Sequence, residues 1–228
     1  MHARNLPRGF DPAKPPILFA DARYVVLNKP AGLPCHPGPR GGPSMEDCFP
    51  ALSRRRDGPW LAHRLDADTA GCLLVALRKA ALRAAQAEFA AGRAGKTYWA
   101  VGSGEMTAEE GVIRLPIARH SDRSGWRMRP DPGGAMAETH WRVLGRAPGR
   151  TWLELTPHTG RTHQIRVHCA SIGLPLLGDP LYGGEAGAPL HLLARGLRLA
   201  VDPPLAAVAP VPAPMRSALA VCGFTGCS

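Results

Sequence analysis

The stretch from Trp60 to Ala76 reads WLAHRLDADTAGCLLVA and organises the rest of the chain. Apolar runs stand at both of its ends, at residues 60–62 and 72–76, and they predict two buried strands. Between them, HRLDADTAG (63–71) predicts a charged loop with a single glycine. A loop held between strands can present a carboxylate in fixed geometry, but a solvated turn has the same composition. The stretch alone therefore leaves both interpretations open.

The chain is large enough to bury a core and is strongly basic. It has 228 residues, of which 45% are hydrophobic, and 28 Lys and Arg against 18 Asp and Glu give a net charge of +10. This charge favours an anionic partner such as nucleic acid. The excess is almost all arginine, which binds phosphate in a bidentate manner but is also enriched by a GC-rich genome. No stretch approaches the roughly 18 apolar residues of a membrane span, and the N-terminus lacks the apolar core of a secretory signal. We expect a soluble, cytoplasmic protein that does not bind membranes.

The cysteines and histidines do not predict a metal site. None of the six cysteines forms a C-x-x-C pair, and we expect free thiols in a reducing compartment. His158, His163 and His168 lie close to Cys169, but a spacing of five residues on a helix turns one histidine away from the next. We therefore expect no metal.

The patterns of apolar and turn residues predict a strand-rich chain. Strands are expected at 17–19, 24–28, 96–101, 112–117, 138–144, 151–155, 175–179 and 190–201, and helices at 45–53, 78–91 and 162–172. Within the strand at 96–101, Tyr98 is expected to share a face with Lys96 and not with the core. Adjacent hairpins without an alternating β-α rhythm predict an α+β fold with a mixed, mostly antiparallel, curved central sheet.

The connecting segments complete this outline. Residues 1–16 are expected to form an extended arm, and residues 17–228 a single domain. Residues 30–43 predict a stiff surface loop because they are rich in proline and glycine. Residues 118–135 predict a long irregular loop, in which arginines around Trp126 suit either an RNA contact or a disordered insertion. Residues 54–56, all arginine, suit either a solvated helix end or phosphate contacts. The tail from Asp202 has no clear pattern.

Four separated segments together resemble the RluA family of pseudouridine synthases. They are NKPAGLP (28–34) with His36 and Pro37; HRLD (63–66) with Thr69, Gly71, Leu73 and Leu74; KTY (96–98); and TGRTHQIRVH (159–168) with Gly173, Pro175, Gly178, Asp179, Tyr182 and Gly183. Each segment is weak alone, but their joint order from about Tyr24 to about Val201 is specific. The chain departs from the family pattern at Ala70, where Ser is usual, and at Leu193, where His is common. Neither is the catalytic position.

The resemblance implies an RNA pseudouridine synthase with a sheet in two lobes and the active cleft across its middle. It also implies that residues 17–228 form a single catalytic domain without a separate RNA-binding module. By motif position, Asp66 resembles the catalytic aspartate, Tyr98 the active-site tyrosine, and Arg166 the basic residue that pairs with the aspartate. Arg64 resembles the arginine that helps to hold the flipped-out nucleotide. The further candidates for substrate binding are His63, Thr69, Arg161, His163, Gln164, Ile165 and Lys29. We expect the loops 30–43 and 118–135 to border the cleft.

The chemistry of the implied reaction agrees with these residues. Uracil is detached from C1′ of its ribose, turned, and rejoined through C5 without a redox change or an energy donor, so we expect no cofactor. An arginine opposite a desolvated carboxylate keeps it ionised, and a tyrosine can stack on the loose base near C5. Contacts of a basic cleft with the RNA backbone would offset the cost of flipping the base, roughly a few kcal/mol. The residues leave open whether Asp66 attacks C1′, adds to C6 or removes a proton from C2′.

The expected partner is an rRNA or tRNA stem-loop with a flipped-out uridine, bound by a monomer; which uridine is modified is not readable. A protein kinase is excluded because Leu65 separates Arg64 from Asp66 and the Gly-rich loop is missing. A glycosidase is excluded because Asp66 and Asp68, two residues apart on one loop, cannot flank a sugar bond. The remaining alternative is an RNA-binding or RNA-folding protein without catalysis. Intact Asp66, Tyr98 and Arg166 argue against it.

Overall fold

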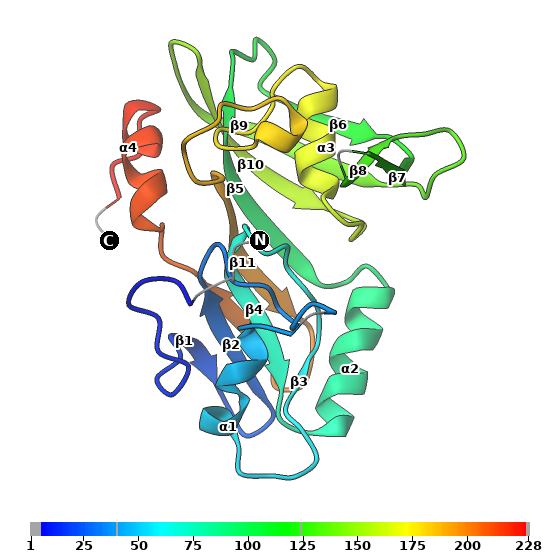
Figure 1. Ribbon diagram of the computed structural model, residues 1–228, viewed down its shortest axis with the longest axis vertical. Coiled ribbons are helices and arrows are strands. Elements are labelled where there is room, and N and C mark those ends of the chain that lie inside the picture. Colours follow the sequence, from blue (N-terminus) through cyan, green and yellow to red (C-terminus); the bar gives the residue numbers. More distant parts are fainter. Residues whose placement is uncertain (1–5, 40, 124, 227–228) are drawn as a thin grey trace. The chain divides into compact units, whose positions relative to one another are not determined.

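The computed structural model of the protein describes residues 6–39, 41–123 and 125–226 (Figure 1). The chain divides into two compact units, which we describe separately: unit 1 is Met1–Lys96 with Ala194–Pro210, and unit 2 is Thr97–Leu193 with Val211–Ser228. Both units combine helices with antiparallel strands, which confirms the predicted α+β class. Residues 1–5 of the predicted arm lie outside the described residues, and the single catalytic domain stays a prediction.

Unit 1 is a sheet with helices beside it. Its strands have the order β1 (Ile17–Ala20), β2 (Tyr24–Lys29), β4 (Ala70–Ala76) and β11 (Leu192–Leu199), while β3 (Trp60–Leu61) pairs with β4 and β12 (Leu205–Val208) with β11. The helices are η1 (Met45–Cys48), α1 (Phe49–Leu52) and α2 (Lys79–Ala90). Ser44 and Asp47 form the predicted capping box. Every residue of β4 is buried, as its apolar run predicted.

Gly71 allows β4 to approach β11 closely. Its φ is +112°, and a Cβ atom at this position would lie 2.2 Å from the carbonyl oxygen of Ala194. An L-residue is strained at such a φ, and the backbone oxygen cannot move away as a flexible side chain could.

We predict that Gly71→Ala destabilises the protein by about 2–4 kcal/mol, measured by urea unfolding. Gly92→Ala is the matched control, because Gly92 also has a positive φ of +70° but no atom within 4 Å of its added Cβ. The control is expected to cost about 1 kcal/mol from backbone strain alone. Equal losses in the two variants would show that the close approach of the strands is unimportant.

Unit 2 is built on a second run of strands. Their order is β5 (Gly95–Ser103), β10 (Arg150–Pro157), β9 (Glu138–Ala147) and β6 (Glu110–Arg114), and β7 (Ile117–Asp122) pairs with β8 (Gly125–Pro130) in a separate hairpin. The helices are α3 (Gln164–Ser171), η2 (Pro180–Tyr182) and α4 (Ala213–Val221). Helix α3 lies on one face of the sheet: its Ile165 and Cys169 share a buried cluster with Leu153 and Leu155 of β10.

The structure corrects three predictions in unit 2. The prediction of an irregular loop at 118–135 is wrong, because most of this segment forms the β7–β8 hairpin. The strand predicted at 175–179 is a single bridge between Leu176 and Gly102. Tyr98 does not avoid the core: it packs against the cluster that contains Ala100 and Leu155, and it is Trp99 that points to the opposite face, where it contacts Trp152 and Phe224.

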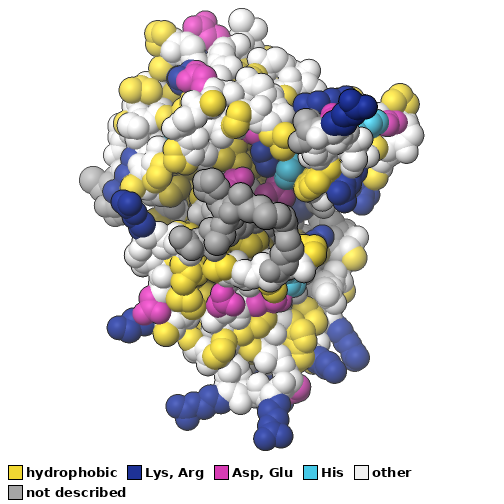
Figure 2. All heavy atoms as spheres, viewed as in Figure 1, with side chains coloured by type: hydrophobic (Ala, Val, Ile, Leu, Met, Phe, Trp, Pro, Cys, Tyr) yellow, Lys and Arg dark blue, Asp and Glu magenta, His cyan; other side chains and the backbone are white. Residues whose placement is uncertain are grey.

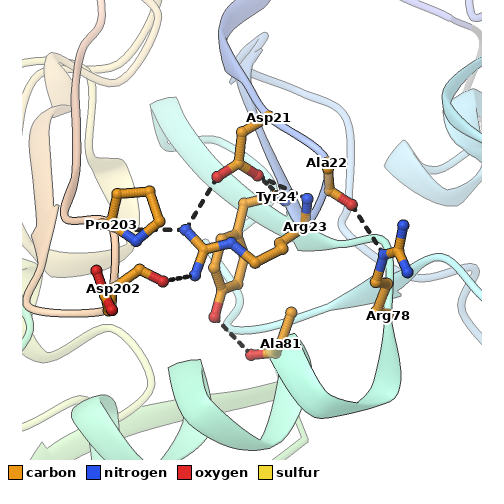
Figure 3. A network of polar contacts seen from close by, with 8 residues as sticks. All are labelled: Asp21, Ala22, Arg23, Tyr24, Arg78, Ala81, Asp202 and Pro203. Carbon is orange, nitrogen blue, oxygen red and sulfur yellow. Dashed lines mark hydrogen bonds and ion pairs between the residues drawn. The ribbon is translucent and has the colours of Figure 1, made fainter.

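A polar network fixes the first turn of unit 1 (Figure 3). The Asp21 carboxylate accepts from the backbone N–H groups of Arg23 and Tyr24 at 2.7 and 2.6 Å and from the Arg23 guanidinium at 3.1 Å. Burial acts to raise the pKa of Asp21, but these hydrogen bonds outweigh it, so the pKa is lowered. The guanidinium also donates to the carbonyl oxygens of Asp202 and Pro203. The Tyr24 hydroxyl donates to the Ala81 carbonyl at 2.8 Å, so β2, α2 and the start of the tail are held together.

The cysteines and the helices can be compared with the expectations from composition. The described cysteines, at 35, 48, 72, 169 and 222, are buried free thiols, and Cys227 lies outside the described residues. Among the helices in the described part of the chain, none has the length and apolar character needed to cross a bilayer.

Candidate active site

Asp66 lies on the loop between β3 and β4, where the sequence predicted a charged tip. The side chain is half-buried, and its carbonyl oxygen accepts from the Thr69 N–H at 3.2 Å in a tight turn. Arg64 is exposed, whereas Thr69 is buried. The loop therefore holds the half-buried Asp66 carboxylate on a fixed turn, and Asp68 on the same loop is exposed.

Lys29 fixes this turn through hydrogen bonds from its side chain to backbone carbonyl groups. Its side chain is fully buried, and Nζ donates to the carbonyl oxygens of Pro30, Leu33 and Ala67 at 2.8, 2.7 and 2.7 Å. Burial lowers its pKa to about 8, so the ammonium stays protonated at neutral pH. The structure gives Lys29 the role of joining two loops, and a direct contact with substrate stays a prediction.

The loop that begins at Pro30 provides a second clamp. The Gly32 N–H donates to the Ala67 carbonyl at 2.9 Å, and the Cys35 thiol lies 3.3 Å from both the N–H and the carbonyl oxygen of Leu65. Residues on both sides of Asp66 are thus bonded to residues 32–35. This explains why a segment rich in proline and glycine follows the NKP motif: it is a rigid support for the turn.

His63 supports the loop from its other end. Its Nε2 accepts a hydrogen bond from the Leu74 N–H at 3.1 Å, and its ring lies 4.9 Å from that of Phe89. Burial lowers the pKa of His63 to about 4. The ring is therefore neutral and joins β4 to α2, and its predicted contact with substrate stays a prediction.

We predict that the protein loses stability in mild acid, because protonation of the His63 ring is unfavourable in the folded state. The pKa of His63 is about 4 in the folded state and 6.5 in the unfolded state. The contribution of the neutral ring to stability is therefore complete above pH 6.5 and is lost as the pH falls toward 4. Between pH 7.5 and pH 5 the loss is about 2 kcal/mol, measured by urea unfolding. His63→Gln keeps an acceptor for Leu74 but cannot titrate, so its stability is expected to fall less over this range. The same fall in both proteins would contradict the assignment.

The motif at 159–168 surrounds the start of α3. The amide of Gln164 is buried: its Oε1 accepts from the Arg161 N–H and the Thr159 hydroxyl at 3.0 and 2.6 Å, and its Nε2 donates to the Glu138 carbonyl and to Thr139. Ile165 lies in the buried cluster of unit 2. These two residues position the segment, whereas Arg161 is exposed and reaches the carbonyl of Met136. Their predicted contacts with substrate stay predictions.

Aromatic rings stack beside His163, which precedes α3 in a left-handed conformation with φ of +53°. The His163 ring is stacked on Trp126 with centroids 5.2 Å apart, and Nδ1 lies 2.7 Å from the Tyr182 hydroxyl. The Arg119 guanidinium lies over the Trp126 ring, 4.7 Å from its centroid. Dark-blue side chains gather over the β7–β8 hairpin in Figure 2. The hairpin thus carries an exposed indole and several arginines to the start of α3.

Arg166 is buried and paired with Asp179. Its Nε and Nη2 donate to the two carboxylate oxygens of Asp179, each at 2.7 Å, and its guanidinium lies 5.1 Å from the ring centroid of Tyr182. The side chains are 8% and 0% exposed. Arg166 is therefore held in one orientation and does not behave as a surface charge of the helix.

The roles of Asp179 and Tyr182 were not predicted from the sequence. Both stand in motif segments, but only the folded structure shows that Asp179 fixes Arg166 and that Tyr182 contacts both His163 and Arg166. Unit 2 thus brings Tyr98, Ile165 and Arg166 to the region of α3, and unit 1 carries Asp66, Arg64 and Lys29. The pairing of Arg166 with Asp66 stays a prediction.

Known proteins resemble the chain along most of its length. The model of the family described as RNA pseudouridylate synthase matches residues 23–171. An uncharacterized RNA pseudouridine synthase of Zymomonas mobilis is 40% identical over 86% of this chain and 93% of its own length. The ribosomal large subunit pseudouridine synthase C of Vibrio cholerae is 36% identical, covering 73% of this chain and 52% of the relative. The human RNA pseudouridylate synthase domain containing 4 has a similar structure, with a TM-score of 0.76, 29% identity, and coverage of 91% and 92%. The matches confirm the resemblance seen in the four motif segments, and the chain belongs to the RNA pseudouridylate synthase family.

Proposed function

We propose that the protein converts uridines of structured RNA to pseudouridine, with Asp66 as the catalytic residue. The observation that carries this proposal is the position of Asp66, half-buried on a turn that Lys29 and Cys35 fix through hydrogen bonds to its neighbours, Ala67 and Leu65. A reaction at a ribose carbon requires a carboxylate with defined position and limited hydration. A turn held in this way meets that requirement.

Residues of unit 2 complete the proposed site. Arg166 would pair with the Asp66 carboxylate and keep it ionised, and Tyr98 would stack on the detached base. The bidentate bond to Asp179 supports this role, because it holds the guanidinium in a fixed orientation. Arg64, which is exposed, would hold the phosphate of the flipped-out nucleotide.

The RNA is proposed to be rRNA or tRNA. The net charge of +10 favours a polyanion, and relatives from Vibrio cholerae and Yersinia pestis are named as ribosomal large subunit pseudouridine synthases. The Arg119 guanidinium, held over the Trp126 ring in the basic β7–β8 hairpin, suits a contact with an RNA phosphate. The predicted monomer and cytoplasmic location stay predictions.

The experiment incubates the protein with transcripts of large-subunit rRNA and of tRNAs, and maps pseudouridine by carbodiimide labelling. Modification of one or a few uridines is expected. Tight RNA binding without any new pseudouridine would contradict the proposal and favour the alternative, an RNA-binding protein without catalysis.

A further inference from the structure

Three side chains that can bind a metal meet on the face of the unit 2 sheet opposite α3. Glu138 and His140 alternate along β9 and so point to the same face, whereas Thr139, between them, points to α3 and bonds to Gln164 and His168. His158 follows β10 and lies opposite Glu138, because its N–H donates to the Glu138 carbonyl at 3.0 Å. None of the three belongs to the four motif segments.

Their geometry is compact. One ligand atom from each residue lies within 4.8 Å of the others. Nε2 of His140 is 2.8 Å from Oε1 of Glu138, and the rings of His140 and His158 have centroids 4.2 Å apart. Two imidazoles and one carboxylate form a donor set that zinc uses with a fourth position open to water.

We propose that Glu138, His140 and His158 bind a divalent transition-metal ion of the zinc class. An ion can enter from solvent, because His158 is exposed and the other two side chains are partly exposed. A cavity of about 260 Å³, also lined by Val112 and Thr156, lies beside His140. The sequence did not predict this set, because Glu138 and His140 are distant from the cluster of histidines after residue 157.

Arg114 would compete with the ion for the Glu138 carboxylate, and this competition provides a test of the site. Its Nε donates to Oε2 of Glu138 at 2.8 Å, while Oε1 faces His140. A guanidinium and a cation compete for one carboxylate, so removal of the guanidinium should strengthen metal binding. A hydrogen-bonded cluster with no affinity for metal would not respond in this way.

The site also has a structural consequence for the motif at 159–168. The Glu138 N–H donates to the Thr159 hydroxyl at 3.0 Å, and the Glu138 carbonyl accepts from Gln164 at 2.9 Å. An ion on the Glu138 side chain would therefore brace the strand to which the start of α3 is attached. Binding to the folded state alone raises the temperature of unfolding.

The experiment titrates the full chain with ZnCl2 by calorimetry and, separately, with Co2+ while its visible absorption is recorded. One ion per chain is expected, with the strong absorption of a four-coordinate site. His140→Ala and His158→Ala should each weaken Zn2+ binding at least about tenfold, and Arg114→Gln should strengthen it several-fold. Zn2+ should raise the unfolding temperature of the wild type but not of His158→Ala.

His120→Ala is the matched control. His120 is also an exposed histidine beside a carboxylate, 2.8 Å from Asp131, but it is not part of the cluster. This variant should bind Zn2+ as the wild type does. Absence of binding by the wild type, or equal affinity of the wild type and His158→Ala, would overturn the proposal. Circular dichroism of each variant shows whether a loss of binding reflects a loss of fold.

Discussion

Asp66→Asn is expected to reduce the rate of pseudouridine formation by at least about 10³-fold while RNA binding is retained. The amide has nearly the same size as the carboxylate, so the turn held by Lys29 and Cys35 should persist. It lacks the negative charge that the proposed chemistry requires, whether the carboxylate attacks a carbon or removes a proton. Single-turnover rates with a modified transcript and filter binding of the same RNA provide the two measurements.

Asp68→Asn is the matched control for this prediction. Asp68 is exposed on the same loop, two residues from Asp66, and the substitution removes the same charge. We expect it to change the rate by less than about tenfold, because an exposed charge acts on bound RNA only through a screened field. Equal losses in the two variants would show that the charge of the loop matters and that Asp66 has no individual role.

Asp179→Ala is expected to destabilise the protein by about 3–5 kcal/mol, because it leaves the buried guanidinium of Arg166 without its two hydrogen bonds to the carboxylate. Chemical unfolding measures this loss. The matched control is Asp57→Ala, which breaks an Arg55–Asp57 pair whose side chains are 54% and 57% exposed. An exposed pair of this kind contributes little, so the control should unfold like the wild type.

The double variant Arg166→Met, Asp179→Leu separates stability from function. Replacement of both charges by apolar side chains removes the uncompensated guanidinium, and most of the lost stability should return. Activity should not return, because Arg166 is proposed to meet Asp66. A stable double variant with wild-type activity would show that the pair serves the fold alone.

The sequence predicted the elements whose apolar pattern is decided locally. The run CLLVA of β4, the alternation in β9 and the stripe of Ile165 and Cys169 each gave the correct element, because burial on one face imposes a period on the residues. The β7–β8 hairpin was missed for the opposite reason. Its strands are mostly exposed and rich in arginine, so neither face has an apolar pattern.

The candidate site shows the same division. Motif spacing identified the loop of Asp66 and the segment around Arg166, but it could not distinguish residues that meet substrate from residues that hold the loop. Lys29 and Gln164 were predicted to bind substrate, which stays a prediction; their burial and their bonds to the protein backbone show in addition that they position the loops. The partnership of Asp179 with Arg166 depends on a turn after α3 that has no periodic signal.

The most direct test of the proposed site is a crystal structure with an RNA that contains the modified uridine. Asp66 is predicted to lie within about 4 Å of the ribose C1′ of a flipped-out uridine, with the Arg166 guanidinium in contact with the same carboxylate. A uridine bound with Asp66 about 10 Å or more from its ribose, beyond the reach of direct chemistry, would contradict the assignment.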